Sequence, residues 1–187
     1  MASARDTWAD REFTGHDFRD EDLSRLCTEQ AVFTECDFSG ANLAESQHRG
    51  SAFRNCTFRR TLLWHSTFAQ CSMLGSVFEQ CRLRPLKFDE VDFTLAVLGG
   101  NDLRGVDFSG CRLRETSLVE ADLRKAVLRG ADLGGARTVG ARLDEADLRG
   151  ATVDPSLWTT ASLTGARIDV PQALAYAVAR GLDVHGH

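Results

Sequence analysis

The chain has 187 residues, a formal net charge of −5 and a hydrophobic content of 43%, which are ordinary values for a globular protein. It contains no apolar run of about 18 residues, so we expect no membrane-spanning helix. The N-terminal sequence MASARDTWADREF carries charges throughout and has no apolar signal core, which predicts a cytoplasmic protein. The mild negative charge argues against nonspecific binding of nucleic acid.

A five-residue repeat follows a lead-in over residues 1–10 that could be flexible. From residue 13 to residue 168 one register has 32 positions, and 29 of them hold a large apolar side chain; the exceptions are Thr28, His48 and Thr138. All eleven phenylalanines lie in this register. Neither an α-helix nor a flat strand has a period of five, so the pattern predicts a solenoid over residues 11–168.

The residue two before each register position is small. Of the 28 such positions from residue 31 to residue 166, 26 hold Ala, Cys, Ser, Thr or Val, and the exceptions are Leu86 and Asn101. Glycine is frequent two residues after the register position, where 12 of the 16 glycines lie. One large and one small inward side chain per five residues describe a wall that turns a corner every five residues. Glycine suits a corner that needs positive φ.

A second period, of twenty residues, predicts four walls per coil. Every fourth register residue from Leu23 to Leu163 is leucine, and phenylalanines recur at the same interval from Phe13 and from Phe18. Like residues twenty apart are expected where each side chain stacks on its equivalent in the next coil. We therefore predict an all-β, quadrilateral solenoid of about eight coils.

The cysteines and the inward histidine do not indicate a metal site. Five of the six cysteines occupy the small position before a register residue, and no paired CxxC spacing occurs. We expect structural cysteines and no metal. His48 takes a register position, where a ligand or a pH switch is one interpretation; an inward histidine with satisfied hydrogen bonds is the interpretation that we favour.

The repeat ends at Ile168, and residues 169–187 are expected to form a short helix and a tail. Asp169 can cap that helix, Pro171 suits its first turn and Gly181 suits its end. Leu174, Ala177 and Val178 share one helical face by their spacing. This segment either caps the solenoid or forms a two-fold dimer contact, together with Trp158 and Leu163 of the last coil.

No catalytic motif is present. The sequence has no GxxxxGK[ST] loop, no HExxH and no nucleophile elbow, and a filled solenoid leaves no concave pocket. We expect a protein that is not an enzyme and that needs no cofactor.

The five-residue repeat resembles the pentapeptide-repeat family, whose members are right-handed quadrilateral β-helices. The segments DFRDEDLSRL, DFSGANLAESQHRGSAFRNCTF, LLWHSTFAQCSMLGSVF and FTLAVLGGNDLRG are similar to the branch associated with fluoroquinolone resistance. The resemblance implies a dimer joined through the C-terminal end. It also implies that this dimer imitates DNA, occupies a duplex-binding surface of DNA gyrase, inhibits the enzyme and protects against fluoroquinolones, without binding nucleic acid or a membrane itself.

The charge supports such imitation only locally. At about 4.8 Å per coil, two chains joined end to end span about 77 Å, and a duplex of that length carries about 45 charges. The dimer carries −10, twice the −5 of one chain. The candidate acidic surface comprises Asp92, Asp102, Asp107, Asp122, Asp132, Asp147, Glu115 and Glu120.

Basic residues lie among these carboxylates. Arg84, Arg104 and Arg124 form a column beside Asp102 and Asp122, and a further arginine lies between Asp92 and Asp132. In the alternative interpretation, each aspartate stabilises a corner and pairs with an arginine. The alternative function is a module that binds a protein other than gyrase.

Overall fold

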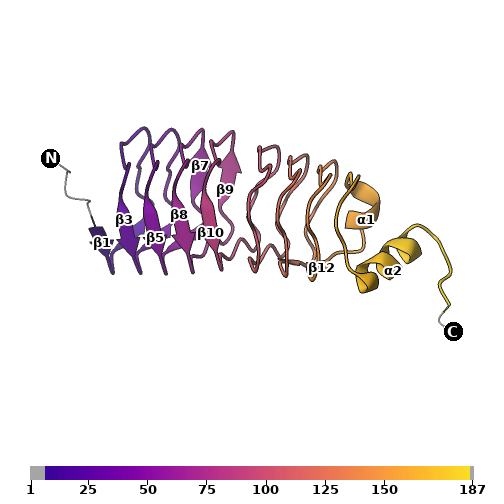
Figure 1. The fold of residues 1–187 in the computed structure, drawn as a ribbon. Helices are drawn as coiled ribbons and strands as arrows, with labels where there is room; N and C mark the ends of the chain where they lie inside the picture. Colours follow the sequence, from indigo (N-terminus) through magenta and orange to yellow (C-terminus); the bar gives the residue numbers. More distant parts are fainter. Residues whose placement is uncertain (1–6, 186–187) are drawn as a thin grey trace.

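The structure is a computed structural model that describes residues 7–185, and it is an elongated solenoid with a short helix at its C-terminal end (Figure 1). The predicted quadrilateral β-helix is confirmed. The expected lead-in lies outside the described residues over 1–6, and the first rung is already formed at Thr7–Ala9.

Short parallel strands stack in register twenty residues apart, and they build three of the four walls. We name each wall by its first register residue: wall A from Phe13, wall B from Phe18, wall C from Leu23 and wall D from Thr28. Wall D contains β1 (Thr7–Ala9), β3 (Cys27–Glu29), β5 (Gln47–Arg49), β8 (Thr67–Ala69) and β10 (Lys87–Asp89). Wall A contains β2 (Glu12–Thr14), β4 (Val32–Thr34), β6 (Ala52–Arg54), β11 (Asp132–Leu133) and β12 (Thr152–Val153). Wall B contains β7 (Thr57–Arg59) and β9 (Val77–Glu79), and wall C is built of single bridges such as Asn42 to Leu62.

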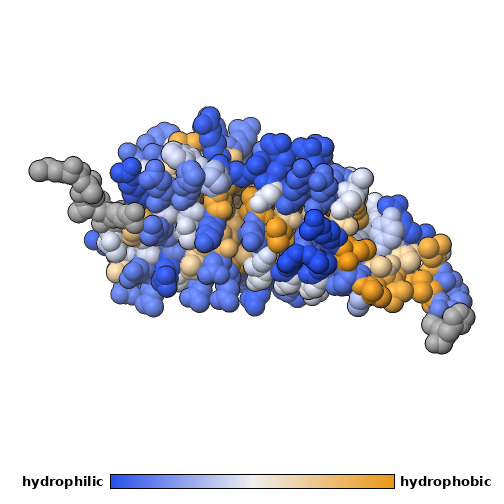
Figure 2. All heavy atoms as spheres, viewed as in Figure 1, coloured by the Kyte–Doolittle hydropathy of each residue, from blue (hydrophilic) through white to orange (hydrophobic). Residues whose placement is uncertain are grey.

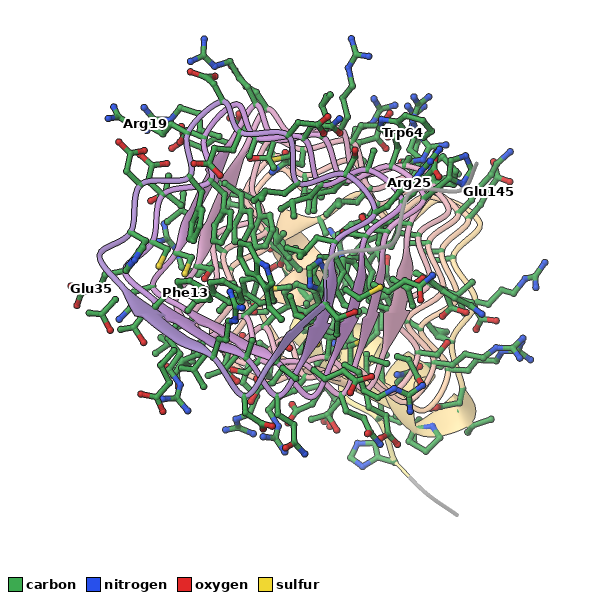
Figure 3. The ribbon with its side chains drawn as sticks, turned by 90° about the vertical axis from the view of Figure 1, so that its left-hand side faces the viewer. Phe13, Arg19, Arg25, Glu35, Trp64 and Glu145 are labelled. Atoms are coloured by element: carbon green, nitrogen blue, oxygen red, sulfur yellow. The ribbon has the colours of Figure 1, made fainter. Side chains whose placement is uncertain are left out.

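The interior is a set of stacked rings, as the twenty-residue period predicts. Phe58 is fully buried, and its ring stacks on Phe38 at 5.0 Å and on Phe78 at 4.7 Å, with interplanar angles of 4°. On wall A, Phe33 and Phe53 stack at 4.7 Å. In the view along the solenoid axis, Phe13 points inward while the charged side chains point outward (Figure 3). Each large side chain therefore packs on its equivalents one coil away.

The corners place every fifth residue in the left-handed region. Between residues 10 and 165, φ is positive at each of these positions except Pro85, Pro155 and Thr160. Glycine fills twelve of them, at little steric cost. Non-glycine residues hold the other seventeen, and Leu95 is the one apolar side chain among them, exposed and with a φ of 62° that costs a leucine more than a glycine.

His48 and the buried cysteines are parts of the core. The His48 ring is buried; its Nδ1 lies 2.8 Å from the Thr28 hydroxyl and its Nε2 lies 2.9 Å from the Ser46 hydroxyl. Burial lowers the pKa of His48 to about 3, so the ring is neutral. Burial also raises the pKa of the Cys56 thiol to about 12, and that thiol is unreactive. No cluster of potential metal ligands occurs among the described residues.

The stacking of coils is interrupted once. Within the part of the chain that the structure describes, no backbone hydrogen bond joins residues 80–90 to residues 99–109, although walls A and B continue through Asp92 and Val97. The two exceptions to the small-residue position, Leu86 and Asn101, both lie at this interruption. A larger side chain at a position that elsewhere holds Ala, Cys, Ser, Thr or Val thus accompanies the loss of backbone hydrogen bonds on walls C and D.

Two helical segments close the C-terminal end. α1 (Leu157–Thr160) replaces a corner, and α2 (Val170–Ala179) begins at Asp169, whose side chain and Gln172 form a reciprocal capping box. Asp169 and Pro171 act at the helix start as predicted, and Gly181 follows the helix with a φ of 82°. Neither helix among the described residues has the length and apolarity that a membrane crossing requires.

Candidate partner-binding surface

Aspartates that precede register residues stabilise the corners. The Asp107 carboxylate accepts the Ser109 backbone N–H at 2.8 Å, and the Asp92 carboxylate accepts the Thr94 N–H at 2.9 Å. Asn42 does the same with the N–H of Ala44 at 3.1 Å. The side-chain oxygen that accepts this N–H can therefore be neutral. An aspartate at this position is explained by the hydrogen bond that it makes in the turn and does not require a binding role.

Arginines then neutralise most of these carboxylates. Asp102 pairs with Arg84 at 2.8 Å and with Arg104 at 2.7 Å, and Asp122 pairs with Arg124 at 2.6 Å. Arg104 donates hydrogen bonds to Asp102 through both Nε and Nη2, and Arg124 does the same to Asp122. Two parallel bonds of this kind form a strong guanidinium–carboxylate pair. The side-chain hydrogen bond from Arg104 holds the pKa of Asp102 well below its usual range.

Three further candidates are paired in the same way. Arg112 lies 3.3 Å from Asp92, and Arg114 lies 3.2 Å from Asp132. Asp147 has an 8% exposed side chain between Arg149 at 2.8 Å and Arg129 at 2.7 Å. Hydrogen bonding from Arg149 is the main reason that the pKa of Asp147 is lowered. A nearly buried carboxylate with two guanidinium partners presents little negative charge to a second molecule.

Asp107, Glu115 and Glu120 are the candidate carboxylates that keep their charge free. Each is exposed, and none has a cationic partner within 4 Å among the described residues. Asp107 lies on wall D, and the two glutamates occupy corners with φ of 54° and 58°. The free negative charge of this region therefore lies at two corners and at one position on wall D.

Charge is distributed in bands along the rod, a feature that wall-by-wall sequence analysis missed. Residues 7–48 contain ten carboxylates and three basic side chains. Residues 49–88 contain one carboxylate and seven basic side chains, and residues 89–122 contain eight carboxylates and three basic side chains. The basic band consists of Arg49, Arg54, Arg59, Arg60, Arg82, Arg84 and Lys87. Counting charge along the chain in coil-length windows would have found the bands.

Six of the eleven large apolar side chains that are exposed in the described structure lie at the C-terminal end, where Figure 2 shows hydrophobic residues on the surface. Leu174 is 49% exposed and Val178 is 61% exposed on α2, whereas Leu163 and Ala177 are half-buried. Trp158 is buried in the last coil, with Tyr176 packed edge-on at 6.0 Å. Of the predicted dimer residues, Leu174 and Val178 are the most exposed.

Gln172 attaches the terminal helix to the solenoid, a role that sequence analysis did not predict. Its side-chain amide donates to the carbonyls of Leu148 and Ala151 at 2.7 and 2.8 Å, and the residue is buried. The last coil still pairs with Leu148, whose N–H donates to the Arg167 carbonyl, but the Ala151 carbonyl has no other donor among the described residues. The Gln172 amide thus supplies donors to backbone carbonyls at the C-terminal end of the solenoid. Such an end must be covered, because its backbone groups have no further coil to pair with.

The fold and its surface define a repeat-built scaffold that presents charge on flat walls. The sequence matches the family described as "Pentapeptide repeat region" over residues 61–138 and that described as "Pentapeptide repeats (8 copies)" over residues 29–60 and 126–154. The chain belongs to the pentapeptide-repeat family.

Within the family, the chain closely resembles proteins named MfpA. It is 83% identical over 100 residues to "Pentapeptide repeat protein MfpA" of Mycobacterium tuberculosis (strain ATCC 25618 / H37Rv), a match that covers 54% of this chain and 55% of that relative. It is 75% identical over 59 residues to the protein of the same name from Mycolicibacterium smegmatis (strain ATCC 700084 / mc(2)155), a match that covers 32% of this chain and 31% of that relative. The chain thus matches about half of the first relative's length and about a third of the second's.

Two solved structures share the solenoid, and both are trypsin-treated variants of QnrB1, described as a plasmid-mediated fluoroquinolone resistance protein. One superposes with a TM-score of 0.53 at 23% identity, covering 96% of this chain and all of that one. The other superposes with a TM-score of 0.51 at 22% identity, covering 95% of this chain and 99% of that one. At these identities the likeness shows the fold.

Proposed function

We propose that this protein binds DNA gyrase as an elongated acidic dimer that imitates duplex DNA, inhibits the enzyme and so protects against fluoroquinolones. It acts by occupying a surface rather than by catalysis. The observation that carries the proposal is a filled rod with free carboxylates on its outer surface. The close resemblance to MfpA supports it, as does the resistance branch that the repeat segments resemble.

The interior explains why a rod can stand in for a duplex. Successive coils are tied by backbone hydrogen bonds and by stacked side chains such as Phe38 and Phe58, and the core contains no buried side-chain polar atom without a partner among the described residues. Such a rod presents its walls without rearrangement, and a preorganised surface loses little entropy on binding.

Free carboxylates contribute most of the imitation in this proposal. Asp107, Glu115 and Glu120 have no cationic partner in the described structure, and the N-terminal band of residues 7–48 holds ten carboxylates against three basic groups. In a dimer joined at the C-terminal end, the N-terminal bands lie at the two tips. Negative charge is thus presented at the two tips and near the middle of each protomer, and not along the whole length.

A supercoiling assay with purified gyrase tests the proposal. We expect the wild-type protein to inhibit supercoiling, and the variant Asp107→Asn/Glu115→Gln/Glu120→Gln to be weaker, with a flatter dependence on salt. Asparagine already serves in this turn at Asn42, and glutamine already occupies left-handed corners at Gln30 and Gln70, so the fold should tolerate these changes.

The matched control is Asp92→Asn/Asp132→Asn, which removes two carboxylates that are already neutralised by Arg112 and Arg114. It should retain most of the inhibition. Equal potency of the triple variant and the wild type would show that shape or the helical tip, and not free charge, carries the binding.

The basic band favours a second candidate function, a non-enzymatic module whose partner is not gyrase. Seven basic side chains against one carboxylate over residues 49–88 are not expected in a uniform imitation of DNA. Absence of any effect on supercoiling and on the ATP turnover of gyrase would eliminate the first function and leave this one.

A further inference from the structure

We infer that a trough on wall C, at the interruption of the coils, is a docking site for an extended acidic peptide segment of a partner protein. This inference rests on the geometry of the trough and does not require the partner to be gyrase. It assigns a role to the column of Arg84, Arg104 and Arg124.

Two adjoining hollows form the trough. One has a volume of about 520 Å³ and is lined by Arg84, Pro85, Leu86, Asp102, Arg104, Gly105 and Val106. The other has a volume of about 330 Å³ and is lined by Arg84, Arg104, Gly105, Arg124, Lys125 and Glu145. They share Arg84, Arg104 and Gly105, so the trough is continuous from the Lys125 end to the opening between the coils.

The trough offers unused backbone groups. In the regular part of wall C, Leu63 donates its N–H to the carbonyl of the next coil at 3.0 Å, and Leu103 does so at 2.9 Å. At the interruption, the equivalent N–H of Leu83 has no partner, and neither the N–H nor the C=O of Asp102 has one, among the described residues. A peptide backbone supplies both the donors and the acceptors that these groups lack.

The charge and the floor of the trough select an acidic, partly apolar segment. Arg84, Arg104, Arg124 and Lys125 line it, and their carboxylate partners are Asp102, Asp122 and Glu145, so that one positive charge is left in excess. Arg82, which has no ion pair among the described residues, precedes Arg84 on the same wall. Pro85, Leu86 and Val106 provide an apolar floor for alternate side chains of an extended chain.

An exposed tryptophan continues this surface. Trp64 lies one coil before Arg84 in the same column and is 37% exposed, with the His65 ring packed edge-on at 5.2 Å. Figure 3 shows the Trp64 side chain on the outside of the rod, where nitrogen-bearing side chains gather around it. Tryptophan and arginine are the residues that contribute most to protein–protein binding, so Trp64 is the anchor expected at the end of a peptide site.

A peptide fits this site better than a nucleic acid does. The unpaired Asp102 carbonyl in the trough needs a hydrogen-bond donor, which a peptide backbone N–H supplies and a phosphate group does not. The apolar floor has no counterpart along a phosphate backbone. The bidentate pairs of Asp102 also leave the arginines fixed rather than free to follow a flexible polyanion.

Fluorescence anisotropy with the full-length protein tests the inference. The probe is a fluorescein-labelled, acetylated octapeptide of alternating glutamate and valine, compared with the alternating lysine–valine octapeptide and a 12-base-pair DNA duplex. We expect the glutamate–valine peptide to bind at least tenfold more tightly than either. No binding of it at 1 mM, equal binding of the lysine peptide or tighter binding of the duplex would overturn the inference.

Two folded variants locate the binding. Leu86→Ala/Lys125→Glu alters the trough at a half-buried and an exposed position, and it should weaken peptide binding at least tenfold. Arg49→Glu/Arg54→Glu is the control, because it changes more charge in the basic band but on walls D and A. A larger loss in the control than in the trough variant would refute the assignment.

Amide hydrogen exchange gives a readout that does not depend on affinity. In the wild-type protein, the amides of Leu83 and Asp102 should exchange faster than that of Leu103, which is hydrogen-bonded. The glutamate–valine peptide should slow exchange at Leu83 and Asp102 at least tenfold. Binding without this protection would place the peptide elsewhere and sink the proposal.

Discussion

Asn101 joins two coils at the point where their backbones separate: its side-chain amide donates to the carbonyl of Phe78 at 2.8 Å and accepts the N–H of Cys81 at 3.2 Å. Ser76, which holds the same small position on wall B, makes the equivalent pair, to Phe53 at 2.9 Å and from Cys56 at 3.0 Å. The longer asparagine side chain thus spans at the interruption what a serine spans in a regular coil. This bond pair links the two coils beside the opening, while walls A and B continue through their own backbone bridges at Asp92 and Val97.

We expect Asn101→Ala to lower the free energy of unfolding by about 1–3 kcal/mol, because it leaves the Phe78 carbonyl and the Cys81 N–H unpaired in a buried site. Chemical denaturation followed by circular dichroism measures this. Ser109→Ala, which removes no side-chain hydrogen bond, is the control. A loss no larger than that of the control would mean that the bridge does not stabilise the coils.

Phe58→Ala should destabilise the fold by about 3–5 kcal/mol, since it opens a void between the stacked rings of Phe38 and Phe78. Phe58→Leu should cost clearly less, because leucine fills the same register position in many other coils. The midpoint of thermal unfolding reports the difference. An unchanged midpoint in the alanine variant would contradict the stacked core.

Stability should fall as the pH drops from about 6.5 towards 3, because the unfolded chain protonates His48 while the folded chain holds its pKa at about 3. Each pH unit in that window costs about 1.4 kcal/mol. Aspartates with lowered pKa values add their own loss only below about pH 4.5, so measurements between pH 6.5 and 4.5 isolate the histidine. In His48→Phe the slope in this interval should disappear; persistence of the wild-type slope would assign it to other groups.

Leu174→Asp should abolish the proposed dimer, because it places a charge on the exposed apolar face of α2. Sedimentation at micromolar concentration should show a dimer for the wild type and a monomer for the variant. Ala175→Asp, an exposed position of the same helix, is the control for charge and helix propensity. A wild-type protein that sediments as a monomer would remove the dimer from the proposed function.

Leu95→Gly should raise the free energy of unfolding by about 1 kcal/mol, although it deletes a large side chain. Leu95 is 53% exposed and holds a φ of 62°, which costs a leucine more than it costs glycine. Gly100→Leu, at the next corner with a φ of 67°, should lower it by a similar amount. Thermal unfolding of both variants checks the pair, and opposite signs to these would argue against strain at the corners.

The five-residue register determined the fold from the sequence alone, because in a solenoid each inward side chain meets its equivalents at fixed steps along the chain. Phe38, Phe58 and Phe78 could be placed in one stack for this reason, and Asp169, Pro171 and Gly181 marked the helix because capping is local. The tertiary structure alone decided which carboxylates keep their charge. Asp102 and Asp147 precede leucines just as Asp107 precedes a phenylalanine, yet Arg84, Arg104, Arg129 and Arg149 reach the first two and no cation reaches the third in the described structure. Ion pairing depends on side-chain rotamers and on the spacing of neighbouring coils, and neither is encoded in the repeat. The opening beside Asn101 and the capping of the last coil by Gln172 have the same origin, since each depends on how far apart two coils lie.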